Sequence, residues 1–265
     1  MTSTRYREDL DLLKAAAIEA GEIALGFFRR DPQVWWKEGN SPVSEADFAV
    51  DLMLRDTLVG ARPDYGWVSE EMQPDDARNI SANRFFVVDP IDGTRAYLRG
   101  ENTWCVSIAM VEDGRPVAGV IAAPAMGEIF EVTADGAPLM NGAPCAVSQP
   151  GEGEPLRLAM PDSMRKRVES SGGEAFVSEP AVPSLAYRLA LVASGRLDGT
   201  LIRPRASDWD IAAADLLIER AGGLLCGRAG TPTIYRSEGR RHDILMAASQ
   251  TAMPRLQRLA KAVPD

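Results

Sequence analysis

Histidine is nearly absent from this chain, because His242 is the single one among 265 residues. This scarcity argues against a Ser-His-Asp triad, a zinc site of the H-E-x-x-H type and acid-base chemistry by histidine. We expect His242, in "RRHDILMA", to be a surface or partly packed residue. If the chain is an enzyme, its carboxylates must do the chemistry.

Cysteines and long apolar runs are also scarce. Cys105, Cys145 and Cys226 are far apart, odd in number and not arranged as C-x-x-C, which favours a reduced, cytoplasmic protein. The start "MTSTRYREDLDLLK" lacks the apolar core of a signal peptide. No run approaches the roughly 20 apolar residues that span a bilayer. We therefore expect no membrane partner.

Basic residues are outnumbered, since 29 Lys and Arg stand against 38 Asp and Glu and the formal net charge is −9. Long-range repulsion then disfavours general binding to nucleic acid, so we expect no direct nucleic-acid partner. A phosphate-bearing ligand would need local positive charge from a metal or a few arginines. The remaining composition, 45% hydrophobic and 25% charged, is that of a globular protein with a sizeable core.

Hydrophobic periodicity predicts an N-terminal half of mixed structure. Helices are predicted over residues 7–28 and 44–61, joined by a loop that contains Lys37, Gly39, Asn40 and Pro42. Strands are predicted over residues 65–72, 84–89 and 127–136, together with a hairpin over 103–124. Asp113-Gly114 is expected at the tight turn of that hairpin.

The clearest composition break is "QPGEGEP" at residues 149–155, which we interpret as a lobe boundary. We predict an N-terminal α+β lobe over residues 1–150 and a C-terminal α/β lobe over 151–265. In the second lobe, strands are predicted at 156–161, 175–179, 199–204, 224–226 and 243–248. Helices are predicted at 163–171, 183–195, 208–223 and from Thr251 onward. The fold class is therefore α/β.

Acidic residues stand at strand ends or in first helical turns at several places. Asp47 and the serine three residues before it predict a capping box. Glu70 and Glu71 close "WVSEE", where strand alternation predicts one inward and one outward side chain. Asp208 is a plausible N-cap, with Asp210 in the first turn of the same helix. Each of these sites has an ordinary structural explanation when taken alone.

Asp89 and Asp92 are harder to explain structurally, because the buried run "RFFVV" leads directly into them. Burying an unpaired carboxylate costs several kcal/mol. Two carboxylates that flank a turn are well placed to share hard cations, and the Ile91 carbonyl between them offers another oxygen. Such ligands suit Mg²⁺ and need no histidine. Gly93 would permit close backbone approach to a phosphate at the following helix start.

The pattern "D-P-I-D-G-T", Asp89 to Thr94, resembles the signature of the inositol monophosphatase superfamily of magnesium-dependent, lithium-sensitive phosphatases. The family has an acidic pair about twenty residues upstream, matched here by Glu70-Glu71. It also has a W-D pair opening a later helix, matched by Trp209-Asp210. The segment "SPVSEAD", ending in Asp47 and preceded by Lys37, is similar as well. The matches occur in the right order along nearly the whole chain.

The resemblance implies a layered α/β/α/β/α sandwich and hydrolysis of phosphate monoesters with two or three Mg²⁺ ions. The implied metal ligands are Glu70, Asp89, the Ile91 carbonyl, Asp92 and Asp210, with Asp47 at a weaker third site. The implied catalytic residues are Glu70, Asp92 and Thr94, of which Glu70 and Thr94 would orient the attacking water. The implied substrate-binding residues are Lys37, Gly93, Thr94, Arg203 and Asp210. Inhibition by lithium is expected.

The substrate is less clearly indicated. Arg95-Ala96-Tyr97 follow D-G-T where inositol monophosphatases usually continue with a short polar residue and Asn-Phe. The continuation "G-T-R-A" is similar to histidinol-phosphatase-like members and to some bisphosphate nucleotidases. Arg203 stands where inositol-specific members often place a glutamate, and the "P-R" segment before the W-D pair is similar to 3′(2′),5′-bisphosphate nucleotidases. An arginine there suits a second phosphate.

We therefore favour adenosine 3′,5′-bisphosphate as the small phosphorylated metabolite, before inositol-1-phosphate and histidinol phosphate. The alternative for Arg203 and Arg205 is that both face solvent at a strand end. Some family members act as regulatory binding proteins in RNA synthesis, so a protein-binding role is a non-enzymatic alternative. The family includes monomers and dimers, which leaves a homodimer open.

Overall fold

The computed structural model describes residues 6–37, 40–72 and 83–263. Its helices are α1 (Arg7–Phe27), α2 (Glu45–Ala61), α3 (Thr94–Leu98), the short 3₁₀ helix η2 (Pro124–Met126), α4 (Asp162–Ser171), α5 (Leu185–Ala193), α6 (Asp208–Arg220) and α7 (Met253–Ala260). Its first strands are β1 (Val34–Lys37), β2 (Ser41–Ser44), β3 (Gly66–Ser69), β4 (Arg84–Asp92), β5 (Cys105–Glu112), β6 (Arg115–Ala123) and β7 (Glu128–Thr133). The later strands are β8 (Leu139–Met140), β9 (Ala143–Pro144), β10 (Leu156–Leu158), β11 (Phe176–Ser178), β12 (Gly199–Ile202), β13 (Gly223–Gly227) and β14 (Leu245–Ser249).

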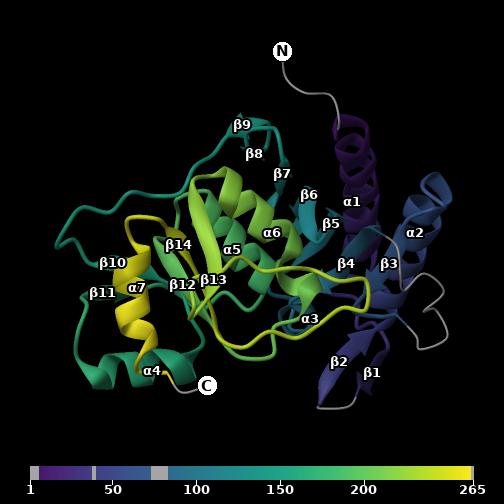
Figure 1. Ribbon diagram of the computed structural model, residues 1–265. Coiled ribbons are helices and arrows are strands. Elements are labelled where there is room, and N and C mark those ends of the chain that lie inside the picture. The colour runs from purple at the N-terminus through teal and green to yellow at the C-terminus, as the bar shows by residue number, and fades with distance from the viewer. Residues whose placement is uncertain (1–5, 38–39, 73–82, 264–265) are drawn as a thin grey trace.

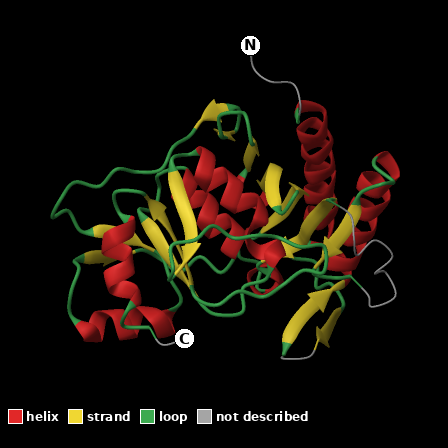
Figure 2. Ribbon diagram, viewed as in Figure 1, coloured by secondary structure: helices red, strands yellow, loops and turns green. Residues whose placement is uncertain are grey.

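The described elements stack as alternating layers of helices and sheets (Figure 1; Figure 2). Helices α1 and α2 cover one face of a sheet ordered β3-β4-β5-β6-β7-β8-β9, and α6 packs on its other face beside α5. Helices α5 and α6 also face a second sheet, ordered β11-β10-β12-β14-β13. The far side of that sheet carries α4 and α7. The predicted α/β class and its layered arrangement are confirmed.

Strand β4 shows why its sequence is a continuous apolar run. Phe86 and Val88 pack in the cluster under α1 and α2, whereas Phe85 and Val87 pack in the cluster under α5 and α6. Side chains alternate along a strand, so a strand covered on both faces needs apolar residues at every position. The buried run therefore brings Asp89 and Asp92 into the interior between two helical layers.

Helix α6 approaches the large sheet closely. A Cβ added to Gly119 of β6 would lie 3.2 Å from the Cα and the carbonyl oxygen of Ala213. Ala212, Ala213 and Ala214 are all buried. The small residues on both sides set the height of α6 above the sheet, and Asp210 lies one turn before this contact.

Several predicted boundaries differ from the structure. The predicted loop between the first two helices includes β1 and most of β2, which pair as an antiparallel ribbon. Residues 38–39 of that loop lie outside the described part of the chain. Strand β3 ends at Ser69, so Glu70 and Glu71 stand in a turn. Strand β4 continues to Asp92 with a register shift after Asp89, where a turn was predicted.

The hairpin of β5 and β6 turns at Asp113 and Gly114, as predicted, and both residues have positive φ values of 50° and 79°. All three cysteines are free thiols. Among the helices of the described residues, none combines the length and apolar character needed to cross a membrane. The division of the chain into lobes at residue 150 stays a prediction.

Candidate metal and phosphate site

The structure brings together three of the carboxylates that the sequence singled out. Asp89 and Asp92 of β4 and Asp210 of α6 each present an oxygen, and these oxygens all lie within 4.8 Å of one another. Asp89 and Asp92 are buried, while Asp210 is partly exposed. Acidic side chains that converge this closely offer a hard divalent cation the oxygen ligands it prefers.

The local geometry of β4 explains how its end presents oxygen atoms. The ladder with β5 shifts register between Asp89 and Asp92, which frees the strand from regular pairing there. Gly93 follows with φ of 95°, a left-handed conformation suited to glycine. The Thr94 hydroxyl lies 3.0 Å from the Ile91 carbonyl oxygen, so this carbonyl faces the start of α3.

Helix α5 holds one oxygen of Asp92. The Ser184 hydroxyl donates to Asp92 Oδ2 at 2.6 Å, and the Ala186 N–H donates to the same oxygen at 2.5 Å. The positive end of the helix dipole also favours a carboxylate there. Sequence analysis missed Ser184, although a serine directly before an apolar helical run is an N-cap signal.

Asp47 and Asp210 occupy equivalent places on two different helices. Ser44 and Ser207 are the N-caps, and each acid is the third helical residue of a capping box. The Ser44 N–H donates to Asp47 Oδ2 at 2.7 Å, and the Ser207 N–H donates to Asp210 Oδ2 at 2.6 Å. The predicted capping box at Asp47 is confirmed. Each cap uses Oδ2 of the carboxylate, so Oδ1 takes no part in the cap.

The prediction that Asp208 caps α6 is wrong, because Ser207 is the N-cap. Asp208 is instead fully buried, and its Oδ1 lies 2.6 Å from Nε2 of His242. Asp208 Oδ2 accepts the Arg240 N–H at 3.0 Å. His242 is buried as well, which corrects the expectation of a surface or partly packed histidine. This contact ties the first turn of α6 to residues 240–242.

The electrostatics of the carboxylate cluster are unfavourable without a counter-charge. Burial raises the pKa of Asp89 well above its usual range, and repulsion from Glu70, Asp92 and Asp210 adds to this. Burial and repulsion from Asp92 likewise raise the pKa of Asp210. Asp89 Oδ1 has no hydrogen-bond partner within the described residues. A buried, unpartnered oxygen among repelling carboxylates fits a divalent cation.

Glu70, Glu71 and Lys37 form the neighbouring part of the site. Lys37 Nζ lies 3.0 Å from Glu70 Oε1 and 2.7 Å from Glu71 Oε1. Burial alone would lower the pKa of Lys37, but the two glutamates raise it. Glu71 is buried, and burial followed by repulsion from Glu70 raises its pKa to about 7. The side chain of Glu70 is 22% exposed and that of Glu71 is 3% exposed. The predicted strand alternation does not explain this difference, because both residues stand in a turn.

Thr94 connects Asp47 to the end of β4. Its hydroxyl lies 3.3 Å from Asp47 Oδ1 and can donate either to this oxygen or to the Ile91 carbonyl. Asp47 is nearly fully buried, and this burial raises its pKa to about 6. Through Thr94, Asp47 is therefore connected to the end of β4, and its assignment to a weaker third metal site stays a prediction.

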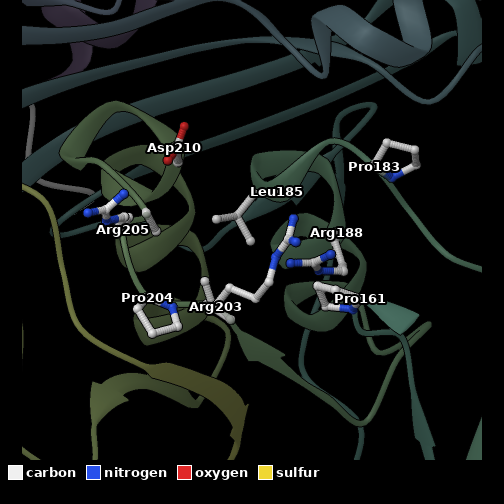
Figure 3. A pocket seen from close by; sticks show the side chains of 10 residues that line it. Pro161, Pro183, Leu185, Arg188, Arg203, Pro204, Arg205 and Asp210 are labelled. Atoms are coloured by element: carbon white, nitrogen blue, oxygen red, sulfur yellow. The ribbon is translucent and has the colours of Figure 1, made fainter. Parts of the chain in front are cut away.

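A pocket of about 330 Å³ opens beside Asp210 (Figure 3). Arg203 and Arg205 line it, and both are exposed, so the structure places them at a pocket as well as at the surface after β12. Arg188 of α5 lines the same pocket and was missed by sequence analysis. It stands within the apolar run "LAYRLALVA", where an arginine ordinarily indicates the solvent side of a helix.

Comparison with known proteins gives a match along nearly the whole chain. The sequence model of the inositol monophosphatase family matches residues 6–264. A histidinol-phosphatase from Chlorobaculum parvum is 31% identical over 247 residues, covering 87% of this chain and 90% of that protein. An inositol-1-monophosphatase from Mesorhizobium japonicum is 35% identical over 231 residues, covering 83% and 86%.

Two further similarities bear on the alternatives for function. The 3′(2′),5′-bisphosphate nucleotidase CysQ of Aggregatibacter actinomycetemcomitans is 28% identical over 235 residues, covering 83% of this chain and 84% of that protein. The crystal structure of the extragenic suppressor protein suhB from Bartonella henselae superimposes with a TM-score of 0.83 at 27% identity, covering 97% of this chain and 100% of that one. These relatives have several different names, so similarity alone does not select a substrate.

Proposed function

Because this chain belongs to the inositol monophosphatase family, whose members are phosphatases, we propose that it hydrolyses a small phosphate monoester with Mg²⁺ as its cofactor. The observation that carries this proposal is the unpartnered Oδ1 of Asp89 inside a cluster of three converging carboxylates. A buried carboxylate without a partner is expensive in a purely structural role. As a ligand of a bound cation, Asp89 Oδ1 would have the partner that it otherwise lacks.

The proposed cation ligands are Glu70, Asp89, the Ile91 carbonyl, Asp92 and Asp210, with Asp47 near a weaker site. When bound there, Mg²⁺ supplies charge neutralisation for the phosphate dianion and makes a water molecule more acidic. For this role the carboxylates must hold their positions before the substrate binds. The hydrogen bonds from α5 to Asp92 and the capping box at Asp210 hold these two carboxylates in place.

The remaining residues are proposed to act on water and on the phosphate. Glu70 forms an ion pair with Lys37, which orients the Glu70 carboxylate. The Thr94 hydroxyl lies between Asp47 and the Ile91 carbonyl. We assign Glu70 and Thr94 to orienting the attacking water. The first N–H groups of a helix lack intrahelical partners, so those of Gly93 and Thr94 are assigned to the phosphate. Lys37 contributes by countering the acidic charge where the substrate binds.

The proposed substrate is adenosine 3′,5′-bisphosphate. Arginines beside Asp210 favour a substrate with a second anionic group over one that carries a positive charge or only hydroxyls. This supports a bisphosphate over histidinol phosphate, which has an ammonium group, and over inositol-1-phosphate. Both remain alternatives because relatives of this chain bear the corresponding enzyme names.

Phosphate release measured with and without Mg²⁺ tests the proposed activity. We expect Mg²⁺-dependent turnover, inhibited by lithium, and a loss of about 10³-fold in kcat for Asp92→Asn because a charged ligand is removed. Mg²⁺ should also raise the melting temperature of the wild type, since a ligand at 100 times its Kd stabilises the fold by about 2.7 kcal/mol. The Asp92→Asn variant should show a smaller rise.

The assignment would be wrong if Asp92→Asn retained wild-type turnover with Mg²⁺. Folding of the variant is checked by its metal-free melting temperature, which should equal or exceed that of the wild type because one repelling charge is gone. If the wild-type chain released phosphate from none of the three esters under any metal condition, the non-enzymatic, protein-binding alternative would be favoured.

A further inference from the structure

The ribbon of β1 and β2 is a two-stranded sheet of its own, and Figure 1 shows it extending below the large sheet. At the end next to α2, the ring of Trp35 packs on that of Phe48 with centroids 5.5 Å apart. The far end of the ribbon is where Lys37 pairs with Ser41. A two-stranded ribbon by itself is at best marginally stable in water, so this far end needs contacts from another part of the molecule.

Arg95, the second residue of α3, supplies contacts at the far end of the ribbon. Its Nη2 donates to the carbonyl oxygen of Asn40, and its guanidinium carbon lies 6.0 Å from the centroid of the Trp36 ring. A guanidinium is attracted to the face of an aromatic ring and stacks on it. Trp36 belongs to β1 and Asn40 directly precedes β2, so one side chain contacts both sides of the ribbon.

Lys37 lies between the two residues that Arg95 contacts, because it follows Trp36 directly and precedes Asn40 by three residues. From this position its Nζ lies 3.0 Å from Glu70 Oε1 and 2.7 Å from Glu71 Oε1. The ribbon determines where the backbone of Lys37 stands, and the backbone determines whether the ammonium group reaches the glutamates. A displacement of the far end of the ribbon would therefore separate Lys37 from both.

Helix α3 is itself fixed on both sides of Arg95. Directly before it, the Thr94 hydroxyl lies 3.0 Å from the carbonyl oxygen of Ile91 at the end of β4. Two residues after it, Tyr97 is buried, and its hydroxyl donates to the Ala24 carbonyl of α1 at 2.7 Å. The contacts of Arg95 therefore tie the ribbon to a segment whose position relative to the carboxylate cluster is set by the core.

We propose that Arg95 is a positioning residue, which holds the far end of the ribbon so that Lys37 stays in contact with Glu70 and Glu71. Its effect on turnover rests on the proposed phosphatase function, whereas its contacts with the ribbon do not. Without Arg95, Lys37 would separate from Glu70, whose carboxylate is assigned to orienting the attacking water. The arginine that follows the D-G-T motif thus acts through Lys37 and does not touch the substrate.

Backbone dynamics of the ribbon test this role without any catalysis. Amide order parameters of Trp36 and Lys37, measured by ¹⁵N relaxation on the full chain, should fall from the rigid range near ~0.85 to below about 0.6 in Arg95→Ala. Arg95→Lys keeps the charge and a donor, so it should give intermediate values. Arg99→Ala is the matched control, because Arg99 ends the same helix and pairs with the exposed Glu101, and it should leave the ribbon unchanged.

Turnover with Mg²⁺ tests whether Arg95 acts through Lys37. We expect kcat/KM to fall about tenfold in Arg95→Ala and about 30-fold in Lys37→Met, by the same factor on adenosine 3′,5′-bisphosphate, inositol-1-phosphate and histidinol phosphate. In the Lys37→Met background, Arg95→Ala should change kcat/KM less than about twofold, because the group that Arg95 positions is already gone. Arg99→Ala should stay within about twofold of the wild type.

Unchanged order parameters in Arg95→Ala would overturn the proposal, because the ribbon would then be held without Arg95. A tenfold loss that persists in the Lys37→Met background would overturn it too, since Arg95 would act independently of Lys37. Arg95 is exposed, and if Arg95→Ala nevertheless does not fold, Arg95→Gln serves in both experiments. A wild-type chain that releases no phosphate, with a ribbon that loosens in Arg95→Ala, would refute the proposed activity alone.

Discussion

A carboxylate has two oxygens, and the acids of this site divide them between different partners. Asp92 gives Oδ2 to the start of α5, while Asp47 and Asp210 give Oδ2 to their own helix caps. The second oxygen of each, Oδ1, takes no part in these contacts. Capping and cation binding are therefore compatible at one residue, and a capping signal in the sequence does not argue against a functional role.

Gly93 is the residue whose replacement tests how tightly the site is built. Gly93→Ala should destabilise the fold by about 2 kcal/mol, because φ is 95° and the new Cβ would lie 3.1 Å from Ser184 Cβ. Since Ser184 donates to Asp92, turnover should fall as well. Urea unfolding and phosphate release measure the two effects.

Gly127→Ala is the matched control for Gly93→Ala. Gly127 has φ of 66°, but an added Cβ would meet nothing within 4 Å. The control should therefore show only the backbone cost of about 1 kcal/mol, with turnover retained. Equal effects of both substitutions on turnover would mean that the contact with Ser184 does not matter.

Among the acidic residues of the site, local sequence signals singled out only Asp89 and Asp92, and the others were assigned to the site through the family resemblance. Asp89 and Asp92 end a buried strand, and Asp47 follows a serine cap. Arg188 could not be found in this way, since its burial depends on the packing of α5 against residues distant in sequence. A charged residue within an apolar helix gives no local indication of whether it faces solvent or a pocket.

At the scale of elements, the first turn of α6 is held from outside the helix. Asp208 bonds to His242 and to the Arg240 N–H, and Ser207 forms a bridge with Arg241. These contacts fix the segment that carries Asp210. The single histidine of the chain is thus structural, and sequence analysis could not show this because the two partners are more than thirty residues apart.

A double-mutant cycle of Asp208→Asn and His242→Gln tests that connection. We expect a coupling of about 2 kcal/mol in the free energy of unfolding, because either single change leaves a buried polar group without its partner. The Mg²⁺ concentration for half-maximal turnover should rise in both single variants as Asp210 loosens.

The exposed pair Arg165 and Glu169 on α4 provides the comparison cycle, with a coupling expected below about 0.5 kcal/mol. A coupling at Asp208 and His242 as small as this surface value would show that the first turn of α6 is held by its own cap alone.

The ribbon of β1 and β2 was predicted as a loop for a related reason. Val34–Lys37 and Ser41–Ser44 are short, and the pairing partner of each is the other. In two strands this short, with exposed tryptophans, the alternation of apolar and polar residues that predicts a strand is weak. The long helices α1, α2 and α6 were predictable because their apolar spacing continues over several turns.

At the scale of the whole molecule, one buried acid connects α6, the large sheet and the long loop before β14. Asp215 of α6 accepts from Arg115 of β6 at 3.1 Å and from the Tyr235 hydroxyl at 2.9 Å. The Tyr235 N–H also donates to the carbonyl of Gly114 at the tip of the hairpin. Burial is the main cause that raises the pKa of Asp215 to about 6.

This pKa predicts a dependence of stability on pH. The pKa of Asp215 rises from 3.8 in the unfolded chain to about 6 in the fold, so the fold favours the protonated acid. The resulting stabilisation is complete below pH 3.8 and is lost as the pH rises through 6. Relative to wild type, Asp215→Asn should therefore become more stable by about 1.4 kcal/mol between pH 5 and pH 8.

Urea unfolding of both proteins at pH 5, 6, 7 and 8 measures the effect. The carboxylates of the site titrate equally in the two proteins, so their contribution cancels in the difference between the two free energies. A difference that stays flat across this range would show that Arg115 and Tyr235 keep Asp215 ionised throughout.

The narrow spacing between Gly119 and Ala213 has a consequence for ion choice. The thickness of the layer between sheet and helix sets how far Asp210 stands from Asp89 and Asp92. A bulkier residue at position 119 would push α6 away from the sheet and increase the distance from Asp210 to Asp89 and Asp92. A substitution at Gly119, which is not one of the proposed metal ligands, should therefore change whether the site prefers small or large divalent ions.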